Sequence, residues 1–555
     1  MKKYLILLLM LPVLLEAQTG YVEVDHNIYP FLERMERLNL IQNYDVFEIP
    51  KTRREISSYL IELSGNKEKL IDSDKRRLID FLNEFEFDIN RTTENYTSLF
   101  SENSIEDHFS QKEKFIYFYE DSSRANIFLN FVANGINIYK HDSNLDENKT
   151  STLFNFGGIL RGSFLDNFGF FIKATNGSYF GDKDLARTYE GLRYNYKLTR
   201  FQEGIGNEYY DETEGYFAVD YDFIRFKIGR DRVRLGQGII KTVLSDNSPP
   251  MDYLHLGFKY KAFTFSHYHG KLLGSDSLYI DPVQEGIKTV ADKYFVYHRF
   301  GVKISNHLSL GVGEVIIYAN RNMDLSYLNP FNFYKSIEHI NQDRDNSLLF
   351  FDISNNSISG LKLYATLLID DINFGQLGTK WYGNQTVLEA GASTSLFYNY
   401  VPIDAAFQFI RVDPYVYTHR IKENNYSSLG FPLVGTIQPN SSNFIFKLDY
   451  FPLNRLDVSF KYVHTIHGAN EYDTEGNLLV NHGGEFEVGH RVGDSENAGH
   501  LDGILEYSNS FELGLRYEPI KNIVISGMLS IVDRSLILNR SEAYVQSILG
   551  LGVKL

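Results

Sequence analysis

Hydrophobic and polar residues alternate with a period of two from about residue 112 to the end of the chain. The alternation is clearest at residues 224–228, 456–462 and 511–517, where apolar side chains take one parity and charged or small side chains the other. Because successive side chains of a β-strand point to opposite faces, each segment has one apolar and one polar face. Transmembrane barrels place the apolar face against lipid and the polar face in the lumen.

The length of this alternating region distinguishes a barrel from a soluble β-sandwich. The pattern continues for about 440 residues without a second linker, whereas sandwiches usually divide into smaller domains. It contains about 18 to 20 strand-like runs, and the last of them, at residues 549–555, suits a strand that closes a ring. We therefore predict an all-β transmembrane barrel of about 18 antiparallel strands over residues 112–555.

Two places break the alternation. Glu314 shares a parity with Leu310 and Val312, and His267 and His269 share a parity with two phenylalanines. A β-bulge would shift the phase of the pattern at these residues. Alternatively, the residues lie beyond the hydrocarbon band, where polar side chains are tolerated. The sequence leaves both explanations open.

Residues 21–90 have helical periodicity instead. Pro30 suits the first turn of a helix, and Thr52 and Glu55 form a capping-box pattern. Because a segment of about 70 residues is too small to bury a secure core alone, we expect it to plug or cap the periplasmic end of the barrel. Residues 91–111 are polar and aperiodic, and we predict a linker there.

Two arginine pairs in the helical region, Arg53–Arg54 and Arg76–Arg77, allow two interpretations. They either bind sugar carboxylates or lipid head groups, or they form salt bridges to the acidic inner wall of the barrel. We favour the second interpretation, because a plug must be held in place by polar contacts.

The N-terminus has the features of a secretory signal peptide over residues 1–17. Lys2 and Lys3 precede an apolar run, Leu5–Leu15, that is too short to span a bilayer, and Ala17 suits a cleavage site. Together with the barrel, this signal predicts a protein of the outer membrane of a Gram-negative-type bacterium.

Composition excludes several classes of function. The chain has no cysteine, which excludes disulfides, thiolate metal sites, cysteine nucleophiles and a lipidated N-terminal cysteine. Its net charge of −16 disfavours a nucleic-acid partner. The 39 tyrosines and 42 phenylalanines suit the aromatic girdles of a barrel in contact with outer-membrane lipid.

Four long polar segments, at residues 179–213, 321–346, 413–439 and 466–504, separate strand-like runs. Because bacterial barrels have short periplasmic turns and longer outer loops, we expect these segments at the extracellular surface. Aromatic faces stack on sugar rings, and arginine binds sugar carboxylates. Our candidates for binding polysaccharide are therefore tyrosines and arginines of two of these loops: Tyr189, Arg193, Tyr194, Tyr196, Tyr415, Tyr417 and Arg420.

An ordered series of motifs crosses the first half of the alternating region. Residues 229–238 read Gly-Arg-Asp-Arg-Val-Arg-Leu-Gly-Gln-Gly, and residues 244–252 read Leu-Ser-Asp-Asn-Ser-Pro-Pro-Met-Asp. The later members are His269-Gly270, His298-Arg299-Phe300, Leu328-Asn329-Pro330 and Ile369-Asp370-Asp371. The series resembles the capsule-assembly Wzi family of outer-membrane proteins, except that a leucine precedes Gly236 where a tryptophan is expected.

The resemblance to the Wzi family implies a barrel of about 18 strands whose periplasmic end is closed by a small helical bundle. It also implies that the protein holds capsular polysaccharide, or a similar exopolysaccharide, at the cell surface. In that role it acts like a lectin and apart from the export channel. We expect the motif positions in the lumen or in turns: Arg230, Asp231, Gly236, Gly238, Ser245, Pro249, Pro250 and Asp252.

The residues indicate neither a catalytic nor a metal centre. No local serine motif stands out as a nucleophile, and Asp370 and Asp371 face opposite sides of a strand because they are adjacent. The histidines of residues 466–504 have no compact metal-ligand spacing. We therefore predict a non-enzymatic protein without a cofactor, and we favour a monomer. A porin or substrate-specific channel is the first alternative, and an outer-membrane lipase or protease is the second.

Overall fold

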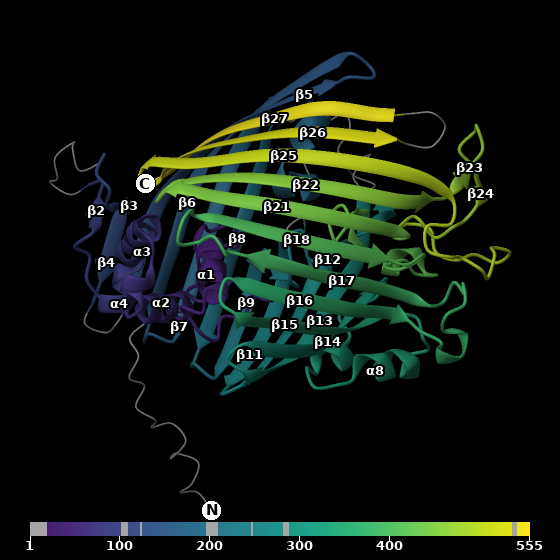
Figure 1. The fold of residues 1–555 in the computed structure, drawn as a ribbon, viewed down its shortest axis with the longest axis horizontal. Coiled ribbons are helices and arrows are strands. Elements are labelled where there is room, and N and C mark those ends of the chain that lie inside the picture. Colours follow the sequence, from purple (N-terminus) through teal and green to yellow (C-terminus); the bar gives the residue numbers. More distant parts are fainter. Residues whose placement is uncertain are drawn as a thin grey trace, which may run out of the picture.

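A closed antiparallel barrel forms the body of the protein (Figure 1). The computed structural model describes residues 19–100, 109–121, 125–195, 209–245, 248–280, 288–535 and 541–555. Within these residues, 18 strands complete the ring, as the alternation predicted. They are β5 (Asn126–Asp142), β6 (Glu147–Phe164), β7 (Phe168–Gly181), β8 (Tyr209–Asp220), β9 (Ile224–Asp231), β11 (Met251–Tyr260), β12 (Phe263–Ile280), β13 (Lys288–Ser305), β14 (Leu308–Ala319), β15 (Asn346–Ile358), β16 (Leu361–Asp371), β17 (Gln385–Thr394), β18 (Ile403–Val412), β21 (Ser441–Leu453), β22 (Leu456–Ala469), β25 (Ile504–Ile520), β26 (Ile523–Ser535) and β27 (Ser541–Lys554).

The last strand closes the ring on the first. Strand β27 pairs with β5 from Tyr544 opposite Asp142 to Lys554 opposite Val132. The short strand β4 (Tyr117–Glu120) pairs with the beginning of the same edge of β5. The other strands of the ring pair with their neighbours in chain order. The closing strand predicted at the end of the chain is therefore confirmed.

The strands face the directions that the alternation predicted. On β25, Leu513 is 51% exposed on the outside of the barrel. Glu512, on the opposite parity, forms an ion pair at 2.7 Å with Lys461 of β22. On β9, Ile228 is exposed and Lys227 is buried. Apolar side chains thus form the outward belt that a membrane barrel requires.

One end of the barrel has short turns and both described chain ends. The connections there include Leu165–Asn167, Lys261–Ala262 and Lys521–Asn522, whereas those at the other end are mostly much longer. The N-terminal helices and the end of β27 lie at the short-turn end (Figure 1). Because outer-membrane barrels have short periplasmic turns, this is the periplasmic end.

The N-terminal region is helical, as predicted, and caps the periplasmic end. It contains α1 (Ile28–Arg37), α2 (Arg53–Ser64), α3 (Asp72–Glu84) and α4 (Glu86–Asn90), with a 3₁₀ turn, η1 (Lys67–Lys69). Their apolar sides share a core that includes Phe31, Leu32, Met35 and Leu60. Thr52 caps α2 as predicted, since its hydroxyl accepts a hydrogen bond from the Glu55 amide at 3.2 Å, but the Glu55 carboxylate binds Arg225 of the barrel at 2.8 Å. Among the described residues, none of the helices has the length and apolarity needed to cross a membrane.

Most of the remaining elements lie in the linker before the barrel and in its extracellular connections. Strand β2 (Tyr96–Ser98) falls in the segment predicted as a linker and pairs in parallel with β3 (Glu113–Phe115). The predicted signal peptide lies outside the described residues. The elements of the extracellular connections are α6 (Lys183–Arg187), η2 (Glu190–Tyr194), α7 (Leu325–Leu328), α8 (Tyr334–Ile340), η5 (Phe374–Gln376), η6 (Lys422–Asn424), β19 (Ser427–Ser428), β20 (Phe431–Pro432), β23 (Glu471–Tyr472) and β24 (Leu478–Val480).

Two connections fold into the barrel and fill part of its interior. Residues 233–244 carry β10 (Arg234–Leu235), which pairs with β1 (Glu48–Ile49) of the N-terminal region. Residues 415–437 contribute Val416, Tyr417, Tyr426 and other fully buried side chains to the same apolar core. A ring of 18 strands is too wide to be filled by its own inward side chains, so loops fill it. The prediction that residues 413–439 form extracellular surface is therefore wrong for this buried stretch.

The segment predicted as an outer loop at residues 321–346 also differs from expectation. Its helix α8 packs against the outer face of the barrel beside β14 and β15 (Figure 1), and α7 packs on α8. Strands β12 and β13 pair without a register shift from Phe263 to Leu273, so no bulge turns His267 or His269. The polar residues that break the alternation face outward and are covered by this segment.

Candidate functional site

A cavity of about 1040 Å³ occupies the part of the barrel interior that the inward loops leave open. Its wall is one continuous arc of the barrel, from β25 to β27 and on through β5 to β9, because β27 pairs with β5. The N-terminal segment Tyr21–Asn27 bounds it toward the periplasm, and residues Tyr189–Asn195 of the loop after β7 bound it toward the outside. The cavity thus lies between the helical cap and an extracellular loop.

Residues that the sequence singled out for two separate reasons meet at this cavity. Tyr189 and Tyr194 were candidates because of loop composition, and the others belong to the motif series. All of them line the same space: Tyr189, Tyr194, Arg230, Asp231, Pro250 and Asp252. The loop after β7 packs against β5, β6 and β7 and reaches β8, where the Asn195 side-chain amide donates to the Asp211 carbonyl at 2.7 Å.

Arg230 and Asp252 form an ion pair at the rim of the cavity. They are register partners at the extracellular ends of β9 and β11, and Arg230 Nη1 lies 2.8 Å from Asp252 Oδ2. Both share the parity of outward-facing Ile228 and Leu254, and both side chains are well exposed. The cavity therefore reaches the outer rim of the barrel beside these two short strands.

The other charged residues of the arginine-rich motif pair with residues outside the motif. Asp231 contacts the ammonium of Lys227 and the hydroxyl of Tyr253. Arg232 and Arg234 both contact Asp25 of the N-terminal segment. The two arginine contacts with Asp25 tie the motif to the N-terminal region.

Charge also organises the periplasmic side of the cavity. Lys173 Nζ lies 2.9 Å from Glu23, and the lysine charge lowers the pKa of that carboxyl to about 2. Lys521 lies 3.0 Å from Glu84 of α3. Sequence reasoning missed all four residues as cavity residues. The one feature of the sequence that could have identified Lys173 is its position on the lumen-facing parity of β7.

The extracellular side of the cavity is aromatic. The ring of Tyr194 meets Phe431 of β20 edge-on at 5.7 Å between centroids, and the Arg193 guanidinium lies 5.8 Å from the same ring. Burial raises the pKa of Tyr194 to about 12, so its hydroxyl remains protonated near neutral pH. Tyr196, a further candidate, lies outside the described residues.

Three other sequence candidates lie elsewhere. Tyr415 and Tyr417 are fully buried, and their hydroxyls donate to the carbonyls of Asn481 at 3.0 Å and Thr242 at 2.8 Å. They hold packed loops together, so they do not offer an exposed face to a sugar. Arg420 is exposed outside the cavity lining and lies 3.7 Å from Asp343.

The remaining motif positions shape the inward connection between β9 and β11. The Gly236 amide donates to the Phe47 carbonyl of the N-terminal region at 2.8 Å, and Gly236 adopts a φ of +127°. A Cβ atom on Gly238 would lie 2.3 Å from the Gln408 amide nitrogen. The Ser245 amide donates to Leu433 at 3.0 Å, and Pro249 is buried nearby. These positions build the fold around the cavity.

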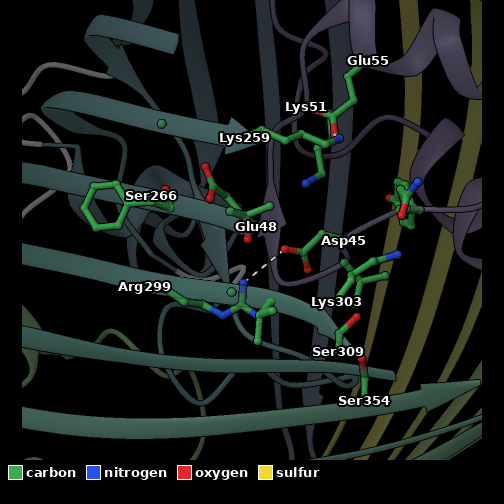
Figure 2. Close-up of a pocket in the computed structure, with 18 of the residues that line it drawn as sticks. Asp45, Glu48, Lys51, Glu55, Lys259, Ser266, Arg299, Lys303, Ser309 and Ser354 are labelled. Carbon is green, nitrogen blue, oxygen red and sulfur yellow. Dashed lines mark hydrogen bonds and ion pairs between the residues drawn. The ribbon is translucent and has the colours of Figure 1, made fainter. Parts of the chain in front are cut away.

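A small pocket of about 100 Å³ marks where the helical cap meets the barrel wall. Figure 2 shows Asp45 facing Arg299 of β13, at 3.2 Å. Glu48 accepts a hydrogen bond from Tyr268 at 2.6 Å. Burial alone would raise the pKa of Glu48, but the hydrogen bond and charge of His255 outweigh it and lower that pKa to about 2. The pocket is thus a docking interface closed by ion pairs.

The arginine pairs of the helical region take part in this docking. Arg54 lies 3.0 Å from Asp222, and Arg77 lies 2.7 Å from Asp457, so both bind the barrel. Arg53 instead pairs with Asp88 of α4 at 2.6 Å. The salt-bridge interpretation is confirmed for one member of each pair.

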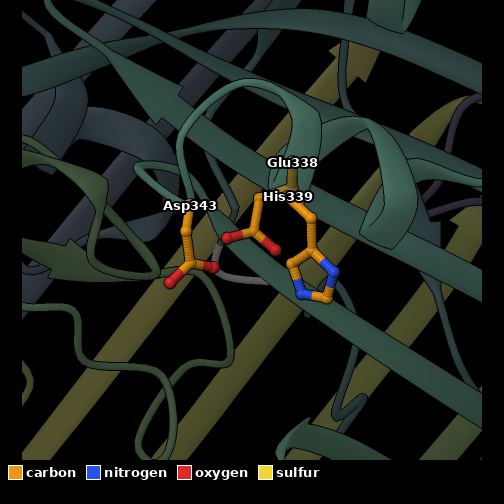
Figure 3. Close-up of side chains that lie close together, drawn as sticks. All are labelled: Glu338, His339 and Asp343. Carbon is orange, nitrogen blue, oxygen red and sulfur yellow. The ribbon is translucent and has the colours of Figure 1, made fainter.

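Metal-ligand chemistry has one candidate among the described residues. Glu338, His339 and Asp343 bring ligand atoms within 4.8 Å of one another on and after α8 (Figure 3). Lys335 lies 3.1 Å from Glu338, and Arg420 lies 3.7 Å from Asp343. Because two cations already compensate these carboxylates, the cluster gives no support to a metal site.

Comparison with known proteins bears on the fold. No protein-family model and no curated protein sequence matches the chain. The solved structure of Wzi, described as an outer membrane protein involved in group 1 capsule assembly in Escherichia coli and as a carbohydrate-binding β-barrel, is similar over 96% of this chain and 99% of its own. Its TM-score is 0.55 and its sequence identity 12%.

Two outer-membrane proteins of Pseudomonas aeruginosa are less similar. The structure of OpdO is similar over 77% of this chain and 97% of its own, with a TM-score of 0.41 and 12% sequence identity. The structure of OccK8 (OprE) is similar over 77% of this chain and 98% of its own, with a TM-score of 0.43 and 9% sequence identity. The match to Wzi extends over the helical cap as well as the barrel. The chain therefore has the fold of Wzi, the outer-membrane barrel whose family the sequence motifs resemble.

Proposed function

We propose that the protein is a non-enzymatic outer-membrane protein that binds polysaccharide in the barrel cavity and attaches it at the cell surface. The observation that carries this proposal is the cavity itself, which is large, aromatic on its outer side and bounded by the helical cap on its periplasmic side. A space of this form suits retention of a chain better than its passage. The carbohydrate binding named for Wzi supports the same function.

The cavity lining favours a neutral, hydroxyl-rich glycan. Tyrosine rings stack on sugar faces, and charged side chains make strong hydrogen bonds to hydroxyl groups. The lining carries more carboxylates than cations, which disfavours a polyanion. The cations are Lys173, Arg230, Arg232, Arg516, Lys521 and Lys554, and the carboxylates are Glu23, Asp25, Glu84, Asp211, Glu212, Glu214, Asp231, Asp252 and Glu518.

A substrate-specific channel is the second candidate function. The polar cavity, which extends from the helical cap to an extracellular loop, favours it. A channel requires measurable ion conductance in planar bilayers, whereas a capped attachment protein conducts poorly.

We further propose that the protein acts as a monomer and that residues 21–90 and 112–555 form its cap and barrel, joined by residues 91–111.

Arg230→Gln is expected to weaken binding of purified surface polysaccharide by about tenfold or more, because a hydrogen bond to a charged group contributes about 1.5–3 kcal/mol. The side chain is 42% exposed at the cavity rim, so the replacement leaves the packed interior intact. Binding is measured by isothermal titration calorimetry on detergent-solubilised protein.

Arg411→Gln is the matched control. Arg411 is 48% exposed, lies near the extracellular end of β18 and pairs with Asp413 at 3.0 Å, but it does not line the cavity. We expect this variant to bind like the wild type. Equal affinities for the two variants would place glycan binding outside the cavity.

A further inference from the structure

A cluster of buried polar residues, His267, His269, His298 and Glu314, lies on the outer face of the barrel, where lipid is expected. We call it the polar cluster. Glu314 lies in the middle of β14 and shares the outward parity of Val312. A membrane-spanning strand needs about 9–11 residues, and β14 has 12. Glu314 therefore lies within the hydrocarbon band, yet it is only 3% exposed.

The connection between β14 and β15 covers this cluster. The Glu314 carboxylate accepts hydrogen bonds from the backbone amides of Tyr334 at 2.9 Å and Lys335 at 3.1 Å, at the beginning of α8. The Tyr334 hydroxyl lies 2.9 Å from His267 Nδ1. Each of these contacts joins an outward-facing strand residue to residues 320–345, which we call the flap.

Polar groups of the turn between α7 and α8 form hydrogen bonds within the protein. His298 lies between the Glu314 carboxylate, 2.9 Å from Nε2, and the Pro330 carbonyl, 3.0 Å from Nδ1. The Asn332 amide donates to the Ser326 carbonyl at 2.8 Å, and the Asn329 amide donates to Asn332 at 2.9 Å. Irregular backbone requires such internal pairing wherever water is absent.

Between residues 325 and 333, the opposite side of the flap exposes large apolar side chains, whereas the charged residues Asp343 and Arg344 are exposed at its end next to β15. Leu325, Phe331 and Phe333 are 79%, 64% and 56% exposed. The Phe331 ring stacks on outward-facing Phe265 of β12, with centroids 5.2 Å apart. Phe265 in turn contacts Phe300 of β13 at 4.6 Å. The apolar surface of the flap is thus continuous with the lipid-facing belt of the barrel.

We propose that the part of the flap from α7 to the beginning of α8, residues 325–333, is embedded in the bilayer, where its outer side contacts lipid acyl chains while the inner side of the flap covers the polar cluster on β12 to β14. The contacts above supply both halves of this inference, because a buried carboxylate needs a cover and an exposed aromatic surface continuous with the belt needs an apolar solvent. The flap begins and ends at the extracellular ends of β14 and β15, so it enters the membrane from the outer leaflet.

Fluorescence quenching by brominated lipid tests this proposal. Trp381 is the single tryptophan of the chain, so Trp381→Phe provides a background into which Phe331→Trp is introduced. Leu513→Trp, on the belt of β25, reports contact with lipid, and Phe374→Trp, exposed in a separate extracellular loop, reports contact with water. The proteins are reconstituted in vesicles of dioleoylphosphatidylcholine or of its 9,10-dibrominated form.

We expect brominated lipid to quench Phe331→Trp by the same factor as Leu513→Trp and to leave Phe374→Trp nearly unquenched. Quenching of Phe331→Trp by aqueous iodide instead would show that the flap lies in water and would overturn the proposal. Protection from both quenchers would also overturn it, because a second copy or another protein would then cover the flap.

Discussion

Replacing Asp404 by asparagine is expected to loosen the helical cap from the barrel. Asp404 lies at the periplasmic end of β18 and accepts hydrogen bonds from Arg34 at 3.0 Å and from Arg37 at 2.7 Å, both on α1. Both guanidinium groups are almost completely buried. Breaking a buried ion pair on one side costs about 3–5 kcal/mol when the remaining charge has lost its partner. Arg34 keeps Asp74 at 3.1 Å, so this cost falls on Arg37, whose other partners are the hydroxyls of Ser393 and Ser395.

The loss of docking is measured by limited trypsin digestion of the reconstituted protein. We expect Asp404→Asn to make the N-terminal helices sensitive to trypsin while the heat-modifiable barrel band on gels persists. Asp449→Asn is the matched control, since Asp449 is the register partner of Asp404 on β21 but pairs with Lys447 of its own strand at 2.8 Å. Equal protease resistance of the two variants would show that this arginine cluster does not hold the cap.

Leu513→Arg is expected to destabilise the barrel by about 2–4 kcal/mol, the cost of an arginine near the middle of the bilayer. Leu513 faces outward on β25, and its register partners, Phe460 of β22 and Leu529 of β26, are apolar. The introduced guanidinium would therefore be surrounded by acyl chains and apolar side chains.

Urea unfolding of the protein in lipid vesicles measures this effect. Arg516→Leu is the comparison, because Arg516 has the opposite parity on the same strand and lines the cavity. We expect its free energy of unfolding to change much less. Similar losses in both variants would mean that the facing of β25 is reversed.

Local patterns in the sequence predicted most of the barrel. Strand facing at residues 511–517 was predictable because it depends only on the alternation along one strand. The ring order then followed from antiparallel pairing of consecutive strands. The start of α2 at Thr52 was predictable for the same reason, since a capping box involves residues three positions apart.

The interior and the flap were not predictable, because they depend on contacts between distant segments. Tyr415 and Tyr417 have the composition of a sugar-binding loop, and only the pairing of that loop with residues 242 and 481 buries them. Glu314 seemed to break the alternation because its cover comes from a connection that the sequence placed at the extracellular surface.

The candidate site was predictable only in parts. The motifs identified Arg230 and Asp252, and loop composition identified Tyr189 and Tyr194, but nothing in the sequence brought the two sets together. Lys173 was missed because a single lysine on the lumen parity of a strand resembles the other lumen-facing polar residues of the barrel. Its meaning depends on Glu23 of the N-terminal segment.

The most direct test of the proposed function is the distribution of surface polysaccharide in cells that lack the protein. Polysaccharide is measured separately in washed cells and in the medium, and the null strain is compared with strains that express the wild type or Arg230→Gln. We expect the null strain to make and export the polymer but release it into the medium. Wild-type protein should return it to the cells and Arg230→Gln should do so only in part. An unchanged cell-bound fraction in the null strain, or a loss of export, would contradict attachment as the function.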